Sequence, residues 1–233
     1  MKMKSTFSIL GLFLLFVEVW SAKYMKIPPP TLTNFLRQKN IYVIDIRDNY
    51  ISKEGFIPKS LIQPISGGYE TILPWIAEKR TNVAVITYND KVDNVANLTR
   101  SLGFNFLGYA IYDEVKSYFP ISVAEYNENT KEDVEKLVKE GQTIIDIREI
   151  YEYKQTGVIK EALLIPLSTF KTEFEKNIPK NKNVYVYCKG GGRALLAMTY
   201  AKRLGYNNNF IVMEGGISKI KKEGYPFVPY SGK

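Results

Sequence analysis

The sequence contains no histidine and only one cysteine, Cys188, among its 233 residues. Without histidine, a Ser-His-Asp or Cys-His catalytic arrangement is excluded, as is any metal site that uses imidazole ligands. A single cysteine cannot form an intramolecular disulfide, a cysteine-cluster zinc site or an iron–sulfur site. We therefore expect no metal and no cofactor, and a fold that rests on its hydrophobic core.

Long basic tracts are absent as well, although the formal net charge is +8. The 32 lysines and arginines are scattered along the chain, and no segment resembles a nucleic-acid-binding module. We expect no nucleic-acid partner. A basic surface of this kind favours small anions instead.

The only export or membrane signal lies at the N-terminus. Residues 1–4 are basic, residues 7–17 are apolar and uncharged, and small residues follow at Ser21 and Ala22. This pattern predicts a secretory signal peptide over residues 1–22, with an uncleaved signal anchor as the alternative. We expect a secreted, endomembrane or periplasmic protein that is monomeric and free of the membrane after cleavage.

The residues best suited to chemistry lie in the stretch 187–194. The β-branched and aromatic residues 184–187 are typical of a buried strand. Three glycines follow Cys188, and after them a run of good helix formers extends to the stop signal at Gly205. The sequence therefore predicts a cysteine at a strand end, on a glycine-rich turn that faces a helix N-terminus.

A cysteine in this position is expected to be a nucleophilic thiolate. The first amides of a helix carry partial positive charge, and a glycine turn can direct further amides inward as an anion nest. Lys189 and Arg193 add full positive charges, which lower a thiol pKa. The plainer interpretation is a small buried cysteine beside an ordinary loop. It explains the cysteine alone, but not its combination with the glycines, the arginine and the helix N-terminus.

The two halves of the chain repeat one pattern. Strand-like segments at residues 41–47 and 143–148 both end in Asp-x-Arg, at Asp45 and Asp146, and residues 82–86 correspond to 183–187. Strands alternate with helices in each half. This alternation predicts an α/β fold in which each half is a parallel sheet covered by helices on both faces.

The second half resembles the rhodanese homology domain, the fold of sulfurtransferases. The stretch from Cys188 to Ala194 is similar to the active loop of the family, Cys-x-x-Gly-x-Arg followed by Ser or Ala. Val158 departs from the histidine that the family often has there. The segments that resemble its other signatures are residues 145–149, 152–153, 157–159, 213–217 and 224–227.

The resemblance implies that Cys188 carries sulfur covalently, with Arg193 as its catalytic partner. Its thiolate would take sulfur from a small anionic donor such as thiosulfate or 3-mercaptopyruvate, and the persulfide would pass it to a thiol or cyanide. Four residues separate Cys188 from Arg193, one fewer than in the related phosphatases and arsenate reductases. Asp146 and Arg148 would brace the loop. The expected substrate-binding residues are Lys189, Gly190, Gly191, Gly192 and Ala194.

The first half resembles a degenerate copy of the same domain. Thr87 stands where Cys188 stands in the second half, and the loop after it has two acids, Asp90 and Asp93, but no glycine or arginine. The resemblance implies two tandem rhodanese-like domains, an inactive one over residues 23–122 and a catalytic one over residues 123–233. The inactive domain would form one wall of the cleft. The alternative is a non-catalytic binding module of the secretory pathway.

Overall fold

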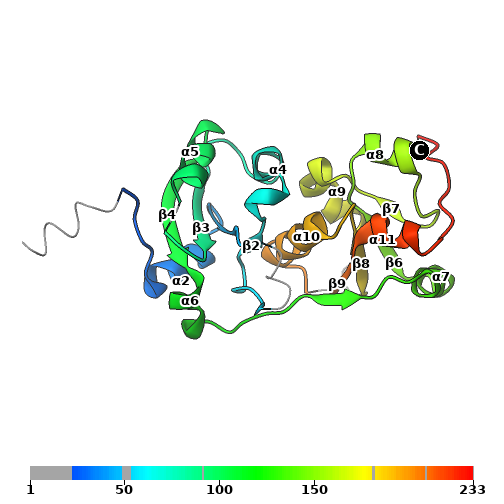
Figure 1. Ribbon diagram of the computed structural model, residues 1–233, viewed down its shortest axis with the longest axis horizontal. Coiled ribbons are helices and arrows are strands. Elements are labelled where there is room, and N and C mark those ends of the chain that lie inside the picture. Colours follow the sequence, from blue (N-terminus) through cyan, green and yellow to red (C-terminus); the bar gives the residue numbers. More distant parts are fainter. Residues whose placement is uncertain (1–22, 49–53, 91, 180–181, 208, 233) are drawn as a thin grey trace, which may run out of the picture.

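The computed structural model describes residues 23–48, 54–90, 92–179, 182–207 and 209–232. They form two parallel β-sheets with helices on both faces of each, which confirms the predicted α/β fold (Figure 1). The signal peptide predicted for residues 1–22 lies outside the described residues. Within the described ranges, no helix has the length and apolar character needed to cross a membrane.

The first half is built on a four-stranded sheet with the order β2-β1-β3-β4. Helices α4 and α5 pack on one face of the sheet, and α2 and α6 pack on the other. The strands are β1 (Ile41–Asp45), β2 (Leu61–Ile62), β3 (Asn82–Thr87) and β4 (Asn105–Ile111). The helices are α2 (Pro29–Arg37), α4 (Tyr69–Ile76), α5 (Asp93–Ser101) and α6 (Tyr112–Val115). Short 3-10 turns are η1 (Ile65–Gly67) and η2 (Lys116–Tyr118).

The second half is built on a five-stranded sheet with the order β5-β9-β8-β6-β7. Helices α9 and α10 cover one face and α7 and α11 the other, while α8 follows β6. The strands are β5 (Glu125–Asn127), β6 (Thr143–Asp146), β7 (Leu163–Leu164), β8 (Val184–Tyr187) and β9 (Phe210–Met213). The helices are α7 (Lys131–Lys139), α8 (Ile150–Thr156), η3 (Leu167–Thr169), α9 (Phe170–Asn177), α10 (Gly192–Arg203) and α11 (Gly216–Lys222).

Alternating side chains explain why the central strand β8 is covered on both faces. In β8, Val184 and Val186 belong to the core under α9 and α10, whereas Tyr185 and Tyr187 belong to the core under α7 and α11. Successive residues of a strand point to opposite faces, so a strand buried on both sides must be apolar throughout. This is why the sequence signal for β8 was a continuous apolar run.

The strand order of the first sheet recurs in the second. Taken from its other edge, the second sheet begins β7-β6-β8-β9, which matches β2-β1-β3-β4. A parallel bridge between Lys26 and Tyr109 extends the first sheet beside β4, where β5 extends the second beside β9. The domain boundaries at residues 122 and 123, and the assignment of the first half as a second rhodanese-like domain, remain predictions.

The two halves pack against each other through α10 (Figure 1). One continuous buried cluster contains side chains from β2 and α4 of the first half and from α9 and α10 of the second. The buried Thr199 hydroxyl accepts a hydrogen bond of 3.1 Å from the Ile62 backbone amide. Because β2 is an edge strand, this helix supplies a partner for a donor that has no neighbouring strand on its outer side.

Arg203 makes a second junction at the far end of α10. Its Nη2 donates to the carbonyl oxygens of Gln38, Lys39 and Ile41 at 2.7–3.0 Å, and its guanidinium lies over the Tyr42 ring at 4.6 Å. Burial lowers the pKa of Arg203. Carbonyl dipoles and an aromatic ring therefore hold this cation, and they tie α10 to the end of α2.

We expect Thr199→Val to lower the free energy of unfolding by about 1–3 kcal/mol, because it keeps the side-chain shape but leaves the Ile62 amide without its partner. Equilibrium unfolding in urea measures this change. Thr172→Val is the matched control, since the Thr172 hydroxyl lies on the surface and donates to the Thr169 carbonyl oxygen, one turn back in the same half. Equal midpoints for the two variants would contradict a role for this bond in holding the halves together.

Candidate active site

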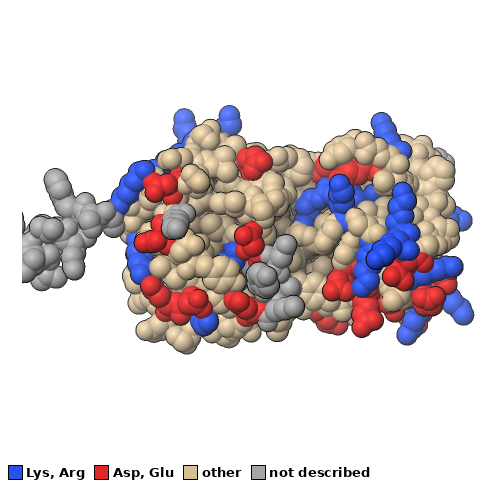
Figure 2. Space-filling model, in the orientation of Figure 1, with Lys and Arg blue, Asp and Glu red and all other residues tan. Residues whose placement is uncertain are grey.

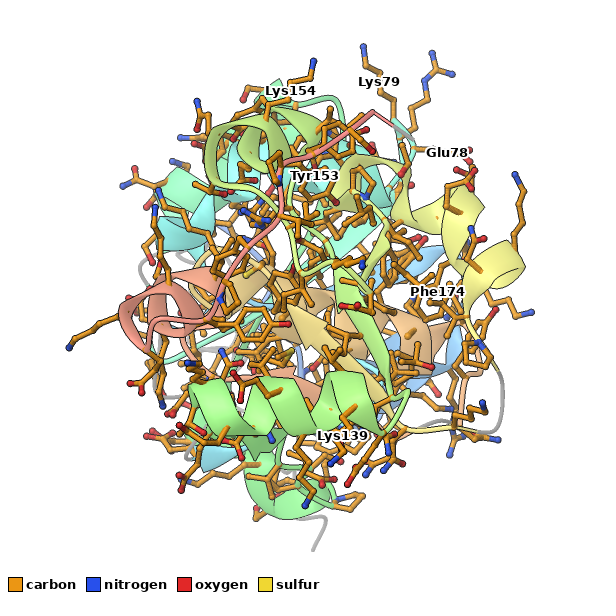
Figure 3. All side chains as sticks on the ribbon, turned by 90° about the vertical axis from the view of Figure 1, so that its right-hand side faces the viewer. Glu78, Lys79, Lys139, Tyr153, Lys154 and Phe174 are labelled. Atoms are coloured by element: carbon orange, nitrogen blue, oxygen red, sulfur yellow. The ribbon has the colours of Figure 1, made fainter. Side chains whose placement is uncertain are left out.

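A buried ion pair closes the end of β6. Arg148 follows Asp146 by two residues and folds back, so that its Nε and Nη2 donate to the Asp146 carboxylate at 2.9 and 2.6 Å. Nη2 also donates to the Gly157 carbonyl oxygen at 2.8 Å. The Tyr153 hydroxyl donates to the Asp146 carbonyl oxygen at 2.9 Å. Figure 3 shows Tyr153 directed inward from α8 and its neighbour Lys154 directed outward.

The first half contains the same pair. Arg47 donates to the Asp45 carboxylate at 2.9 and 2.8 Å and to the Gly55 carbonyl oxygen at 2.7 Å. Its guanidinium stacks over the Tyr112 ring at 3.3 Å. Because the pair recurs in a half that has no cysteine, we infer that it stabilises the fold. That Asp146 and Arg148 also brace the cysteine loop stays a prediction.

Cys188 follows β8 directly, and its side chain is only 2% exposed. The Gly191 backbone amide donates to the Cys188 Sγ at 3.1 Å. Gly191 has a φ of +102°, a conformation that side-chain-bearing residues rarely adopt, and α10 begins at the next residue. The cysteine sulfur therefore lies beside the positive end of a helix, as the sequence predicted.

The start of α11 supports the loop from behind. The Ile217 amide donates to the Cys188 carbonyl oxygen at 2.8 Å, and the Ser218 amide donates to the Lys189 carbonyl oxygen at 3.2 Å. A Cβ on Gly216 would lie 2.2 Å from the Cys188 carbonyl oxygen. Only glycine allows this approach, which explains why a glycine stands there in the segment 213–217.

Arg193 is engaged by Glu152 of α8. Its two terminal nitrogens donate to the two Glu152 carboxylate oxygens at 2.6 and 2.8 Å, in a bidentate pair. Burial opposes the charge on Arg193, but the Glu152 bonds and the nearby Cys188 sulfur hold its pKa above its ordinary value. Arg193 thus places positive charge near the sulfur, while two of its five N–H donors bond Glu152.

Glu152 is the residue of this site that sequence reasoning did not assign a role. It is 8% exposed, which is unusual for a glutamate. Burial acts to raise the pKa of Glu152. Hydrogen bonds from the Arg193 side chain and the Glu149 backbone amide outweigh burial and lower this pKa. The sequence signal for this residue was its position directly before Tyr153, in the segment 152–153 that resembles a rhodanese signature.

A pocket of about 240 Å³ lies over the glycine loop, and both halves of the chain line it. The second half contributes Gly190, Gly191, Gly192, Leu195, Tyr126, Val212, Glu214 and Gly215. The first half contributes Asp48, Ile62 and Pro64, so it forms one wall, as expected. Cys188, Lys189, Arg193 and Ala194 are not among these lining residues, and the cysteine adjoins the pocket only through Gly191, whose amide contacts its sulfur.

Larger hollows lie elsewhere and are not lined by the cysteine loop. One of about 390 Å³ is lined by basic side chains that include Lys202 and Arg203. The 12-residue helix α10 separates Arg203 from the cysteine loop by about 16 Å. Figure 2 shows basic and acidic side chains interspersed over the C-terminal half, without one continuous basic surface on that face. Of these hollows, the smaller pocket is the one lined by Gly191, whose amide contacts the Cys188 sulfur.

Known proteins match the half that carries this loop. The rhodanese-like domain family matches residues 130–223. The C-terminal half of this chain is a rhodanese-like domain. A tRNA uridine(34) hydroxylase of Yersinia enterocolitica is 32% identical over 120 residues, which are 47% of this chain and 33% of that protein. This chain thus spans a third of the length of that curated relative.

Two solved structures similar to this chain share 27% sequence identity with it. A rhodanese-related protein of Thermoplasma volcanium is matched over 45% of this chain and 100% of its own, with a TM-score of 0.38. The polysulfide-sulfur transferase homodimer of Wolinella succinogenes is matched over 47% of this chain and 81% of its own, with a TM-score of 0.37.

The first half differs from the rhodanese-like domain where the domain has its active loop. Thr87 ends β3, and Tyr88 follows it. At the corresponding place in the second half, the glycine-rich turn follows β8. The Tyr88 hydroxyl donates to Glu54 at 3.0 Å, and Arg47 donates to the same oxygen at 3.3 Å. A carboxylate and an aromatic ring stand here in place of the Gly191 amide, so the described residues at this end of the first sheet form no equivalent contact.

We expect Glu152→Gln to reduce stability at neutral pH by roughly 1–3 kcal/mol, because Arg193 loses a charged acceptor. A carboxyl with a lowered pKa stabilises the fold above its ordinary value of 4.5, and this contribution is lost as the pH falls through the folded-state pKa. The difference between the parent protein and the variant should therefore shrink at pH 3.

Urea unfolding at pH 7 and pH 3 checks this expectation. The matched control is Glu140→Gln, because Glu140 is exposed at the end of α7. A difference between parent and Glu152→Gln that stays constant with pH would show that the pair contributes by shape and not by charge.

Proposed function

We propose that the protein is a sulfurtransferase in which Cys188 carries a sulfane sulfur as a persulfide. The observation that carries the proposal is the position of the Cys188 Sγ, at 3.1 Å from the Gly191 amide and at the start of α10. Such a site stabilises a sulfur anion without any histidine. Membership of the second half in the rhodanese-like domain family supports the same reaction class.

The reaction is a two-step transfer. In the first step the Cys188 thiolate attacks the outer sulfur of thiosulfate, a new S–S bond forms, and the old S–S bond breaks to release sulfite. In the second step an acceptor thiolate attacks the terminal sulfur, takes it, and leaves Cys188 as a thiolate again. Neither step consumes an oxidant or a reductant, and each intermediate is covalent.

The protein contributes electrostatic stabilisation more than proton transfer. The negative charge sits on a Cys188-bound sulfur throughout the cycle, and fixed amide dipoles are already oriented toward it. Arg193 adds a nearby cation whose direction Glu152 fixes. The support of the loop by α11 keeps these donors from relaxing as the charge moves from one sulfur to the next.

We assign the first half the role of an inactive rhodanese-like partner, in a protein that enters the export pathway through residues 1–22. The shared strand order and the absence of a glycine loop after Thr87 support the first part of this proposal. The basic and apolar pattern at the N-terminus supports the second.

A non-catalytic binding module is the second candidate, and the burial of Cys188 favours it. Cys188 is almost fully buried, and Arg193 directs two of its five N–H donors to Glu152. A module of this kind would keep the loop as a rigid docking surface. Formation of a persulfide distinguishes the two functions.

We expect incubation with thiosulfate, 3-mercaptopyruvate or a low-molecular-mass persulfide to add one sulfur atom to the protein. Intact-mass spectrometry measures the addition, and a thiol acceptor should then remove it. Cys188→Ser is the control and should gain nothing, because the chain has no other cysteine. If the thiol stays reduced and gains no sulfur from any of the three donors, the sulfurtransferase proposal is wrong.

A further inference from the structure

The charges that line the pocket over the cysteine loop are negative. Its ionisable lining residues are Asp48 from the first half and Glu214 and Tyr126 from the second. No lysine or arginine of the described chain is among them. An anionic donor in this pocket therefore has two carboxylates, as well as the loop glycines, among its neighbours.

The cations nearest to these groups are already paired or lie outside the lining. Arg193 is held by Glu152, and Lys219 pairs with Glu214 at 2.9 Å. Lys189 is exposed and is not a lining residue. Asp48 accepts a hydrogen bond of 2.9 Å from the neutral Ser66 hydroxyl, and it forms no ion pair with any residue that the structure describes. Of the two carboxylates, Asp48 thus makes the larger contribution to the field in the pocket.

The remaining walls are apolar and close together. Ile62 and Pro64 face the pocket from the first half, and Leu195 and Val212 from the second. The volume of about 240 Å³ is below the roughly 300–1,000 Å³ of pockets that bind drug-sized ligands. The pocket thus suits a small molecule with a short carbon chain and disfavours a bare, strongly hydrated dianion.

We propose that the substrate of this pocket is a small aminothiol persulfide, in which Asp48 and Glu214 bind the ammonium group while the sulfane sulfur reaches Cys188. This proposal rests on the sulfurtransferase function proposed above, and it replaces the anionic donor expected from the sequence by a cationic or zwitterionic one. Asp48 and Glu214 are then positioning residues that select the substrate.

The transfer step balances with this donor. The Cys188 thiolate attacks the terminal sulfur of R–S–SH, the S–S bond of the donor breaks, and the products are a Cys188 persulfide and the thiolate R–S⁻. The transferred sulfur keeps its proton, so no base is needed at this step. The negative charge that forms on the leaving sulfur lies beside the ammonium group of the same molecule.

Charged methanethiosulfonates test the charge preference independently of turnover. The Cys188 thiolate attacks the sulfenyl sulfur, the bond to the sulfonyl sulfur breaks, methanesulfinate leaves, and a mixed disulfide remains. Because Cys188 is the only cysteine, intact mass reports this single site. The measurement compares two rates of modification, with the 2-aminoethyl reagent and with the 2-sulfonatoethyl reagent. Their ratio for the protein is divided by the same ratio for the free thiol 2-mercaptoethanol. The neutral methyl reagent measures how accessible the Cys188 sulfur is.

We expect this relative ratio to be about tenfold above one for the parent protein, because two carboxylates act within a partly enclosed pocket. Asp48→Asn should lower it by about threefold or more, and Glu214→Gln should lower it further by removing a carboxylate and releasing Lys219. Asp48→Glu should retain the preference. Glu140→Gln, which changes net charge equally on the exposed end of α7, should have no effect.

A relative ratio near or below one, or one that neither Asp48→Asn nor Glu214→Gln changes, would overturn the proposal. A methyl reagent that fails to react would do the same, since the pocket would then not lead to the sulfur. Unchanged urea midpoints show that the variants fold. If the charge preference holds but no donor forms a persulfide, the sulfurtransferase function fails while the selectivity of the pocket stands.

Discussion

The contact between the Gly191 amide and the Cys188 sulfur is the interaction on which the rest of this site depends. It requires a backbone that turns with positive φ directly before α10, and a second close approach where Gly216 meets the Cys188 carbonyl oxygen. The loop is thus held by the N-terminus of α10 on one side and by the N-terminus of α11 on the other. Side chains add charge to this arrangement, but backbone geometry creates it.

The recurrence of the pair formed by Asp146 and Arg148 in the first half separates folding from chemistry. A buried carboxylate and guanidinium close the end of the strand in both sheets, and each arginine also reaches a glycine carbonyl beyond it. Breaking such a pair would leave a buried charge at a cost of roughly 3–5 kcal/mol. Both halves therefore keep it, whether or not a nucleophile follows the neighbouring strand.

Local patterns made the second half predictable, and long-range contacts limited the rest. The strand before Cys188, the turn and helix after it, and the α/β class all follow from apolar runs and glycines that lie close in sequence. The pair between Glu152 and Arg193 joins residues 41 positions apart, and no periodicity marks it. The same holds for Asp48, which reaches the pocket only because β2 packs against α10.

Helix α10 therefore has two tasks that cannot be separated. Its first turn holds the sulfur, while Thr199 and Arg203 further along hold the first half in place. A shift of this helix relative to β2 would move the pocket wall that carries Ile62 and Asp48 relative to the loop. Since packed interfaces resist continuous deformation, this packing fixes the position of the first-half wall relative to the cysteine loop. A half without a nucleophile then has a physical reason to remain attached to the half that has one.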